Sequence, residues 1–202
     1  MQQQSDEWFK ARVGKATASR FKDILATIKS GEAADRRNYR AALVCERLTG
    51  TPEQTYTNAA MAWGTEQEPF ARIAYMAKTG LIVDDAGFIQ HPEMMAGASP
   101  DGLIGKDGGL EIKCPNKATH LATLLAQKMP PEHMAQVQGA MWITGRQWWD
   151  FVSYHPEFPE HLQLFIQRIE RDEKYITQLA LAVSLFLSEV DEEVKALSQL
   201  AA

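Results

Sequence analysis

Apolar residues recur with two different spacings along this chain, and these spacings divide it into helical and extended stretches. The helical spacing is clearest at Phe21, Ile24, Leu25 and Ile28, which follow the i, i+3, i+4, i+7 pattern of an amphipathic helix. A longer stripe of the same kind predicts a helix over about 172–198 that packs against the domain or a neighbouring subunit. Further helices are predicted over 6–10, 35–48, within 57–79, and over 117–128 and 132–144.

Extended stretches lie between the helical ones, as short apolar runs or alternating patterns bounded by turn residues. Strands are predicted over 81–83, 87–90, 103–105, around Glu111, and over 148–154 and 162–169. The early strands follow one another directly, so we expect them to pair antiparallel. This order of elements predicts an α/β fold with a mixed central β-sheet flanked by helices. No linker or internal repeat interrupts the chain, and we expect a single domain over 1–202.

Candidate chemistry is concentrated in the predicted hairpin, which contains Asp101 after a proline and then Glu111-Ile112-Lys113. Glu111 and Lys113 share one face of their strand, while Ile112 points into the packed side. A turn at 106–109 folds Asp101 back toward Glu111. Two carboxylates and one ammonium suit a magnesium-dependent phosphodiesterase, because Mg²⁺ prefers hard oxygen ligands. The alternative is an exposed hairpin with ordinary surface charges.

A second candidate site lies in the loop before the Phe21 helix, where Arg12 precedes Gly14 and the hydroxyls of Thr17 and Ser19. Either hydroxyl can cap the following helix. Free N–H groups at a helix start favour a phosphate, and Arg12 could bind that phosphate with two hydrogen bonds. The simpler alternative is that Ser19 is only a cap and Arg12 only a surface charge.

The charge is unevenly distributed, and this changes what the net value of −5 implies. Residues 10–47 hold ten Lys or Arg and four acids, a local balance of +6, whereas 156–202 have nine acids and four bases. Such a chain can present a basic groove to phosphates while its outer surface stays acidic. A solvated helix face would explain the same pattern.

Other features of the sequence bear on the location of the protein. No apolar run reaches the length of a membrane span, and residues 1–7 lack the charged and apolar regions of a signal peptide. Cys45 and Cys114 are too few for a disulfide framework, and no CxxC or His-Cys cluster indicates structural zinc. We therefore expect a cytoplasmic protein with no membrane partner.

Several ordered motifs resemble one known family. The chain resembles the phage lambda exonuclease and YqaJ-type viral recombinase family, within the PD-(D/E)xK nuclease superfamily, from about residue 8 to 175. The motifs are Arg12-x-Gly14-x-x-Thr17-Ala18-Ser19, Ala62-Trp63-Gly64-x-x-x-Glu68, Ser99-Pro100-Asp101-Gly102-Leu103, Leu110-Glu111-Ile112-Lys113-Cys114-Pro115, Met134-Ala135-Gln136-Val137-Gln138, Met141-Trp142 and Glu170-Arg171-Asp172-Glu173-Lys174-Tyr175.

The resemblance implies a restriction-endonuclease-like core and a 5′→3′ exonuclease of phage or prophage origin. Such an enzyme resects one strand of linear duplex DNA from a 5′-phosphate, releases mononucleotides and leaves a 3′ single strand for annealing-type recombination. It further implies a cytoplasmic ring-shaped homotrimer that cooperates with a single-strand annealing protein. The implied cofactor is Mg²⁺, as two ions, with Mn²⁺ as a possible substitute.

The resemblance also implies residue roles. Asp101, Glu111 and the backbone carbonyl of Ile112 would bind the metal, and Lys113, Glu68 and Gln136 would complete the catalytic group. The 5′-phosphate would be received by Arg12, Ser19 and Thr17, and Met61 would help to separate the strands.

Two positions depart from the family pattern. His133 stands where the superfamily often has tyrosine, so its contact with a phosphate would depend on pH. Lys29 stands where the family has a minor-groove arginine, and lysine makes a less specific contact.

Three other functions are compatible with parts of the sequence. One is a structure-specific or repair endonuclease on the same fold, and another is a catalytically inactive DNA-binding assembly module. The complete set of Asp101, Glu111 and Lys113 speaks against the inactive module. A metal-dependent hydrolase of small phosphoesters is the third, disfavoured by the basic span over 10–47 and the long final helix.

Overall fold

The computed structural model describes residues 3–53 and 59–200, which contain one four-stranded and one three-stranded sheet. The four-stranded sheet has the order β4 (Gly102–Ile104), β5 (Gly108–Lys113), β6 (Trp148–Tyr154) and β7 (Leu164–Glu170). The small sheet has the order β1 (Ala16–Thr17), β3 (Ala96–Ala98) and β2 (Ile89–Gln90). In each sheet one pair of strands is parallel and the remaining pairs are antiparallel. The predicted mixed α/β architecture is therefore confirmed.

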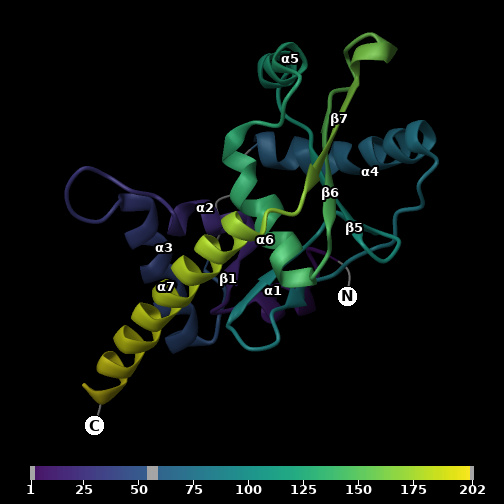
Figure 1. Cartoon of the computed structure of the whole chain (residues 1–202). Helices are drawn as coiled ribbons and strands as arrows, with labels where there is room; N and C mark the ends of the chain where they lie inside the picture. Colours follow the sequence, from purple (N-terminus) through teal and green to yellow (C-terminus); the bar gives the residue numbers. More distant parts are fainter. Residues whose placement is uncertain (1–2, 54–58, 201–202) are drawn as a thin grey trace.

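Helices surround these sheets (Figure 1). Their bounds are α1 Asp6–Arg12, α2 Phe21–Ile24, α3 Ala34–Thr49, α4 Ala59–Thr79, α5 Lys117–Ala126, α6 Met134–Thr144 and α7 Glu173–Gln199, with 3₁₀ turns η1 Ala18–Arg20, η2 Pro131–His133 and η3 Glu160–Leu162. None of the helices in the described ranges is both long and apolar enough to cross a membrane.

The four-stranded sheet is covered on both faces. On one side, Tyr75 of α4 packs in a cluster with Leu110 and Ile112 of β5. On the other, α6 and α7 enclose a larger core around Trp149 and Phe151 of β6. Both faces of β5 are therefore buried, which suits a central strand with a parallel neighbour. This double coverage holds the hairpin that carries the candidate chemistry.

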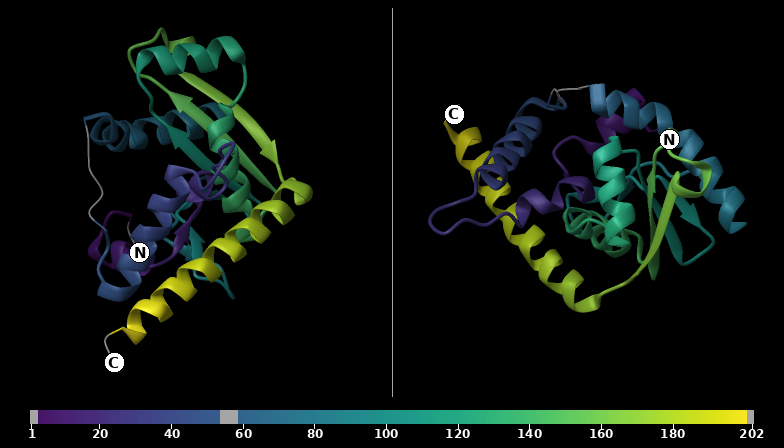
Figure 2. Two further views of the ribbon diagram at one scale, coloured as in Figure 1. Left: turned by 90° about the vertical axis from the view of Figure 1, so that its left-hand side faces the viewer. Right: turned by 90° about the horizontal axis from the view of Figure 1, so that it is seen from above.

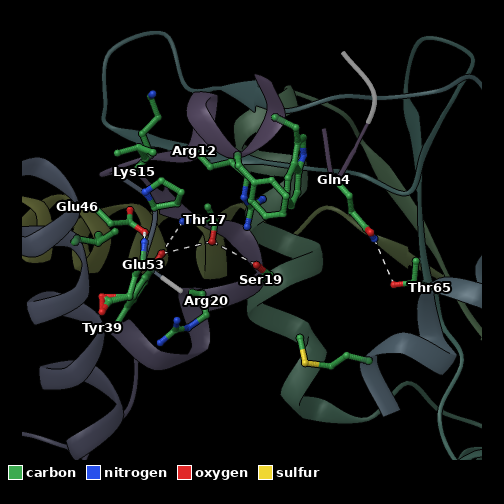
Figure 3. Close-up of a pocket in the computed structure, with 16 residues that line it drawn as sticks. Gln4, Arg12, Lys15, Thr17, Ser19, Arg20, Tyr39, Glu46, Glu53 and Thr65 are labelled. Atoms are coloured by element: carbon green, nitrogen blue, oxygen red, sulfur yellow. Dashed lines mark hydrogen bonds between the residues drawn. The ribbon is translucent and has the colours of Figure 1, made fainter. Parts of the chain in front are cut away.

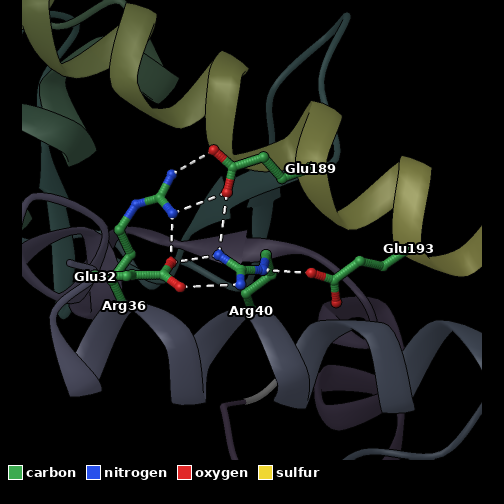
Figure 4. Close-up of polar contacts among 5 residues, drawn as sticks. All are labelled: Glu32, Arg36, Arg40, Glu189 and Glu193. Atoms are coloured by element: carbon green, nitrogen blue, oxygen red, sulfur yellow. Dashed lines mark hydrogen bonds and ion pairs between the residues drawn. The ribbon is translucent and has the colours of Figure 1, made fainter.

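Ion pairs join α3 to α7 (Figure 4). Arg36 bonds both carboxylate oxygens of Glu189 at 2.8 Å, and Arg40 Nε lies 2.6 Å from Glu193 Oε1. Glu32, just before α3, contacts both arginines. Figure 2 shows α7 running along the molecule beside α3, so the predicted packing of the last helix against the domain is confirmed.

Some predicted elements differ from the observed ones. The helix expected to reach Ile28 ends at Ile24, because only Phe21 and Ile24 of that stripe are fully buried and Ile28 is 55% exposed. Neither hydroxyl caps a helix, since Thr17 stands at the N-cap position of η1 without a side-chain cap bond and Ser19 lies inside η1. Both capping predictions were therefore wrong.

The predicted strand at 81–83 is also wrong. That segment contains no strand, and the nearest pairing is a single bridge between Asp84 and Leu103. Conversely, β3 has the sequence Ala-Gly-Ala, which lacks the β-branched residues that signal a strand. A side chain at Gly97 would collide with the Phe88 ring, so this strand needs small residues for packing. The predicted helix within 57–79 begins at Ala59, and Thr57 lies outside the described residues.

Candidate active site

The β4–β5 hairpin places Asp101 beside β5. Leu103 pairs with Gly109, and Asp101 lies just before the first paired residue, Gly102. The Asp101 N–H donates to the Leu110 carbonyl at 3.2 Å, and the Ile112 N–H donates to Asp101 Oδ2 at 2.6 Å. The aspartate is thus held by the residues on either side of Glu111.

Glu111 is the most enclosed acid of the group, with 2% of its surface exposed. Its Oε1 accepts hydrogen bonds from Lys113 Nζ at 2.6 Å and from Gln136 Nε2 at 2.5 Å. Gln136 comes from α6, which packs over the same face of the sheet. The structure therefore brings together Asp101, Glu111 and Lys113, which the sequence predicted for the hairpin, and adds Gln136, which the resemblance implied.

A third carboxylate approaches from α4. Burial, followed by the charge of Glu111, raises the pKa of Glu68. Burial and the charges of Glu111 and Glu68 raise the pKa of Asp101 well above its usual value. Burial opposes the charge on Lys113, but the neighbouring acids outweigh it and raise the lysine pKa. Acids that raise one another's pKa would be relieved by a cation among them.

The donor set suits a hard divalent cation. Asp101 and Glu111 supply carboxylate oxygens, and the Ile112 carbonyl lies on the same strand, so all three candidate ligands are oxygens. No three His, Cys, Asp or Glu residues in the described ranges form a metal-binding cluster by themselves. The candidate set instead combines two carboxylates with a backbone oxygen, and Lys113 and Gln136 now occupy one oxygen of Glu111.

Arg72 connects α4 to the hairpin. Its guanidinium donates to the Asp101 carbonyl at 3.3 Å and to the Val83 carbonyl at 2.7 Å, and it lies 2.8 Å from Asp85. Arg72 stands one helical turn after Glu68 on α4. Its bond to the Asp101 carbonyl therefore connects the helix of Glu68 to the backbone of Asp101. The sequence analysis did not single out this residue, because its role depends on backbone carbonyls far away in the chain.

The N-terminal loop forms the second candidate site. The Arg12 guanidinium lies 4.0 Å from the Trp8 ring centroid, and its Nη1 donates to Ser99 Oγ at 2.9 Å. Burial lowers the pKa of Arg12, but an arginine side chain keeps its charge. Within the parts of the chain that the structure describes, Arg12 forms no ion pair, in contrast to Arg36, Arg40 and most other arginines. A half-buried cation without a carboxylate partner is suited to an anion.

The turn after Arg12 is held by two neighbouring residues of α3. The Gly14 N–H donates to Glu46 Oε2 at 2.7 Å, and Arg47 Nε donates to the Gly14 carbonyl at 2.8 Å. Gly14 has a positive φ of 68°, a conformation that favours glycine. Arg47 also pairs with Asp191 of α7. The turn is therefore fastened from both sides to the α3–α7 pair.

Thr17 and Ser19 lie beyond this turn. Their hydroxyls are 3.3 Å apart, and the Thr17 N–H donates to the Tyr39 hydroxyl at 2.8 Å. The helix that follows is only the four residues of α2. The N–H groups expected to receive a phosphate therefore belong to the 3₁₀ turn η1 rather than to a long helix, and the anion site stays a prediction.

Two cavities that share Arg12, Thr17 and Ser19 in their walls lie at the candidate sites. A cavity of about 410 Å³ is lined by Arg12, Lys15, Ser19, Arg20 and Met61 among others (Figure 3). A smaller one is lined by Arg12, Thr17, Ser19 and Ser99 and also by Glu111 and Gln136. The N-terminal loop and the hairpin thus line one hollow, although almost one hundred residues separate them.

The three predicted DNA contacts lie in different places. Met61 is 51% exposed in α4 and lines the larger cavity. His133 stacks on Phe151 with a centroid distance of 5.3 Å, and burial lowers its pKa to about 4, so it is neutral at pH 7. Lys29 is exposed in the segment between α2 and α3 and lines neither cavity.

Sequence reasoning missed several residues that hold the sites in place. Ser99 appeared only as part of a motif, and Trp8 was given no polar contact. Yet Trp8 Nε1 and Arg12 both donate to Ser99 Oγ. Tyr39 and Glu46 had no signal at all, because a single residue inside a helical stripe does not reveal what its polar atoms bind.

Comparison with known proteins identifies the family. The YqaJ-like viral recombinase domain matches residues 7–147, and the chain belongs to that family. The expected resemblance is therefore confirmed.

The chain is also similar to particular proteins. An alkaline exonuclease from Laribacter hongkongensis, LHK-Exo, is 49% identical over 98% of both chains, with a TM-score of 0.90, or 0.92 for its complex with dAMP. A phage-related exonuclease from Haemophilus somnus 129PT shares the fold, with a TM-score of 0.73 at 17% identity over 91% of this chain and 96% of its own. ExoD of Escherichia coli strain K12 is 37% identical over 60 residues, which are 30% of this chain and 68% of ExoD.

Proposed function

We propose that this protein is a metal-dependent 5′→3′ exonuclease of double-stranded DNA. It resects linear ends from a 5′-phosphate, releases mononucleotides and leaves a 3′ single strand for annealing-type recombination. The observation that carries the proposal is the hollow shared by Arg12 and Ser19 on one side and Glu111 and Gln136 on the other. The similarity to LHK-Exo, named an alkaline exonuclease and crystallised with dAMP, supports it.

The hairpin would carry out the cleavage. Asp101, Glu111 and the Ile112 carbonyl would hold Mg²⁺, as two ions, with Mn²⁺ as a substitute. When bound, the ions would lower the pKa of the attacking water and offset charge on the leaving 3′-oxygen. The raised pKa values of Asp101 and Glu68 support this assignment, because burial and the neighbouring acids disfavour their charged forms and a bound divalent cation would favour them.

Lys113 and Gln136 would act on the water and the phosphate. In this structure both donate to Glu111 Oε1, so each already points into the acidic group. Water attacks phosphorus, the bond from phosphorus to the 3′-oxygen breaks, and that oxygen receives a proton. Lys113 would orient the water and stabilise negative charge on the phosphoryl oxygens, while Glu68 and Gln136 hold the surrounding groups in place.

The N-terminal loop would provide the preference for one end. Arg12 would bind the 5′-phosphate with two hydrogen bonds, and the hydroxyls of Ser19 and Thr17 would donate to its remaining oxygens. Met61 across the cavity would separate the last base pair. Lys29 and His133 would contact the backbone further away, with neutral His133 as a hydrogen-bonding partner.

The protein would work in a larger assembly. We include in the proposal a homotrimer that encircles DNA, a single-strand annealing protein as partner, and the cytoplasm as location. The α7 helix supports an intermolecular role because it carries exposed leucines: Leu181, Leu185 and Leu197 are 62%, 57% and 44% exposed.

One alternative shares every residue of the hairpin. A structure-specific endonuclease on the same fold would use the same acids and lysine, but it would not need a free 5′-phosphate. A catalytically inactive DNA-binding module is the other alternative, and the intact contact between Glu111 and Lys113 speaks against it.

The deciding experiment uses linear duplex labelled separately at each 5′ and each 3′ end, with covalently closed circular duplex as the control. The proposal expects magnesium-dependent release of the 5′ label as a mononucleotide, late release of the 3′ label and an intact circle. Cleavage of the circle would support the endonuclease. No nucleotide release at any Mg²⁺ or Mn²⁺ concentration would support the inactive module.

A further inference from the structure

The hydroxyl of Ser99 joins the two candidate sites. It accepts a hydrogen bond from Arg12 Nη1 and another from Trp8 Nε1, each at 2.9 Å. Asp101 follows two residues later, with only Pro100 between them. The side chain that would bind the terminal phosphate is therefore fastened to the same short segment that carries a candidate metal ligand.

This segment has little freedom to move. Gln3 donates to the Pro100 carbonyl at 2.7 Å, and Asp101 is held by Ile112 and by Arg72 at its carbonyl. The proline ring also restricts its own φ and the backbone of Ser99. Movement of Ser99 relative to Asp101 is accordingly small.

Arg12 depends on Ser99 for its orientation. Its guanidinium carbon lies over the Trp8 ring and 5.8 Å from the Phe88 ring centroid, and a contact with a ring face leaves a planar group able to turn and slide. The bond to Ser99 Oγ supplies the direction that stacking lacks. No carboxylate competes for Arg12 in the described residues, so its remaining N–H groups are available for a ligand.

We propose that Ser99 is a positioning residue that fixes the distance between the anchored 5′-phosphate and the bond that is cut, and so limits each product to one nucleotide. The inference rests on the proposed function. Without the Ser99 hydroxyl, Arg12 can still bind the phosphate but no longer in one place relative to Asp101. The next phosphate along the strand then reaches the cutting position in a fraction of events, and dinucleotides are released.

The experiment measures product length, which a loss of stability alone does not change. Duplex with a 5′-phosphate and an internal label in the first nucleotide linkage is digested with the full-length protein and Mg²⁺, and early products are separated by size. Wild type is expected to release mononucleotides. Ser99→Ala is expected to raise the share of dinucleotides among the products several-fold. The cleavage rate per enzyme molecule is expected to fall by a smaller factor.

Two variants separate the proposed role from other effects. Ser153→Ala removes a hydroxyl that bonds His120 Nδ1 at 2.8 Å outside the cavity, and wild-type product lengths are expected. Trp8→Phe removes the second donor to Ser99 but keeps a ring beneath Arg12, and it is also expected to release mononucleotides. Ser99→Cys keeps the side-chain size with a weaker acceptor, and it provides the test if Ser99→Ala does not fold.

The outcomes separate the inference from the proposed function. Mononucleotides alone from Ser99→Ala and from Ser99→Cys, in folded and active protein, would overturn the role of Ser99. A rise in dinucleotides with Ser153→Ala equal to that with Ser99→Ala would also overturn it. If wild type showed no preference for 5′-phosphorylated ends, the proposed function itself would fail.

Discussion

The N–H of Ile112 donates to Asp101 Oδ2 at 2.6 Å, so the residue between Glu111 and Lys113 holds the other acid of the hairpin. This bond holds Asp101 against β5 and occupies one of its carboxylate oxygens. The second oxygen stays available. The hairpin thus orders its own acids before any partner or ligand arrives.

Replacing Lys113 with alanine is expected to lower the cleavage rate about 100-fold or more, which is typical for the loss of one group that stabilises charge in the transition state. DNA binding should survive, because the phosphate contacts proposed for Arg12 and Ser19 remain. Rates from a single-turnover digest and affinity from anisotropy would check both. Lys117→Ala is the matched control, since Lys117 is exposed and pairs with Glu157. Near-normal cleavage by the Lys113 variant would remove it from the catalytic group.

Arg12→Ala is expected to narrow the rate difference between 5′-phosphorylated and 5′-hydroxyl duplex ends. The cause is the loss of a cation that lines both cavities and forms no ion pair within the described residues. The measurement is the ratio of kcat/KM for the two substrates, compared with Arg37→Ala, which removes an exposed charge from the same basic region. An unchanged ratio for Arg12→Ala would contradict the assigned phosphate pocket.

Gly14→Ala is expected to destabilise the fold by about 1–2 kcal/mol from its positive φ alone, and further by a clash. An added Cβ would lie 2.7 Å from Arg47 Cγ. Gly31→Ala provides the comparison, because Gly31 also has a positive φ but nothing lies within 4 Å of an added Cβ. Urea unfolding of both variants should show the larger loss at Gly14. Only Gly14→Ala should also weaken the preference for 5′-phosphorylated ends. If the two variants lost equal stability and equal preference, the contacts of α3 with the Gly14 turn would not be what positions the loop.

Arg72→Ala is expected to weaken Mg²⁺ or Mn²⁺ binding about tenfold, the usual cost of losing a group that orients metal ligands. Calorimetric titration of the metal into protein without DNA gives this value independently of activity. Arg72→Lys should recover part of it, since lysine can still donate to the Asp101 or the Val83 carbonyl. If the metal affinity of Arg72→Ala were unchanged, Arg72 would have only a structural role and would not orient the metal ligands.

Acid should loosen the contact between α3 and α7. Hydrogen bonds from Arg40 and Arg36, against some burial, lower the pKa of Glu32, and a bond from Arg36 does the same for Glu189. A carboxylate whose pKa is lower in the folded state contributes stability above its unfolded pKa of 4.5, and this is lost as pH falls through the folded pKa. The free energy of unfolding in urea should therefore fall below about pH 4.5. The double variant Arg36→Met, Arg40→Met should show a smaller decrease in the free energy of unfolding between neutral and acid pH. If the decrease were the same as in wild type, other acids would be responsible for it.

The sequence predicted the parts of this protein that depend on local pattern. The strand alternation of Glu111, Ile112 and Lys113 placed the three side chains correctly, because the period of a strand does not depend on its neighbours. The helical stripe beginning at Phe21 was overextended, since an apolar residue such as Ile28 looks the same whether or not the core reaches it. The three small residues of β3 gave no strand signal.

The supporting contacts were beyond sequence reasoning for a different reason. Ser99, Glu46 and Arg72 act through bonds to side chains or carbonyls that the fold brings from distant segments. Their residue types are common on any surface. Only the observed positions distinguish a serine that receives Arg12 and Trp8 from one that faces water.

The border of the family match has a consequence for anyone who shortens the chain. Residues 7–147 end just before β6, yet β6 is the parallel neighbour of β5 and pairs with it from Gly108 to Lys113. A fragment cut at that border would leave the strand of Glu111 with an open edge, prone to pairing with other chains. It would also lose Asp191, the partner that holds Arg47 against the Gly14 turn. The segment that matches the family is thus shorter than the segment that can fold by itself. The shortest functional fragment must extend into α7.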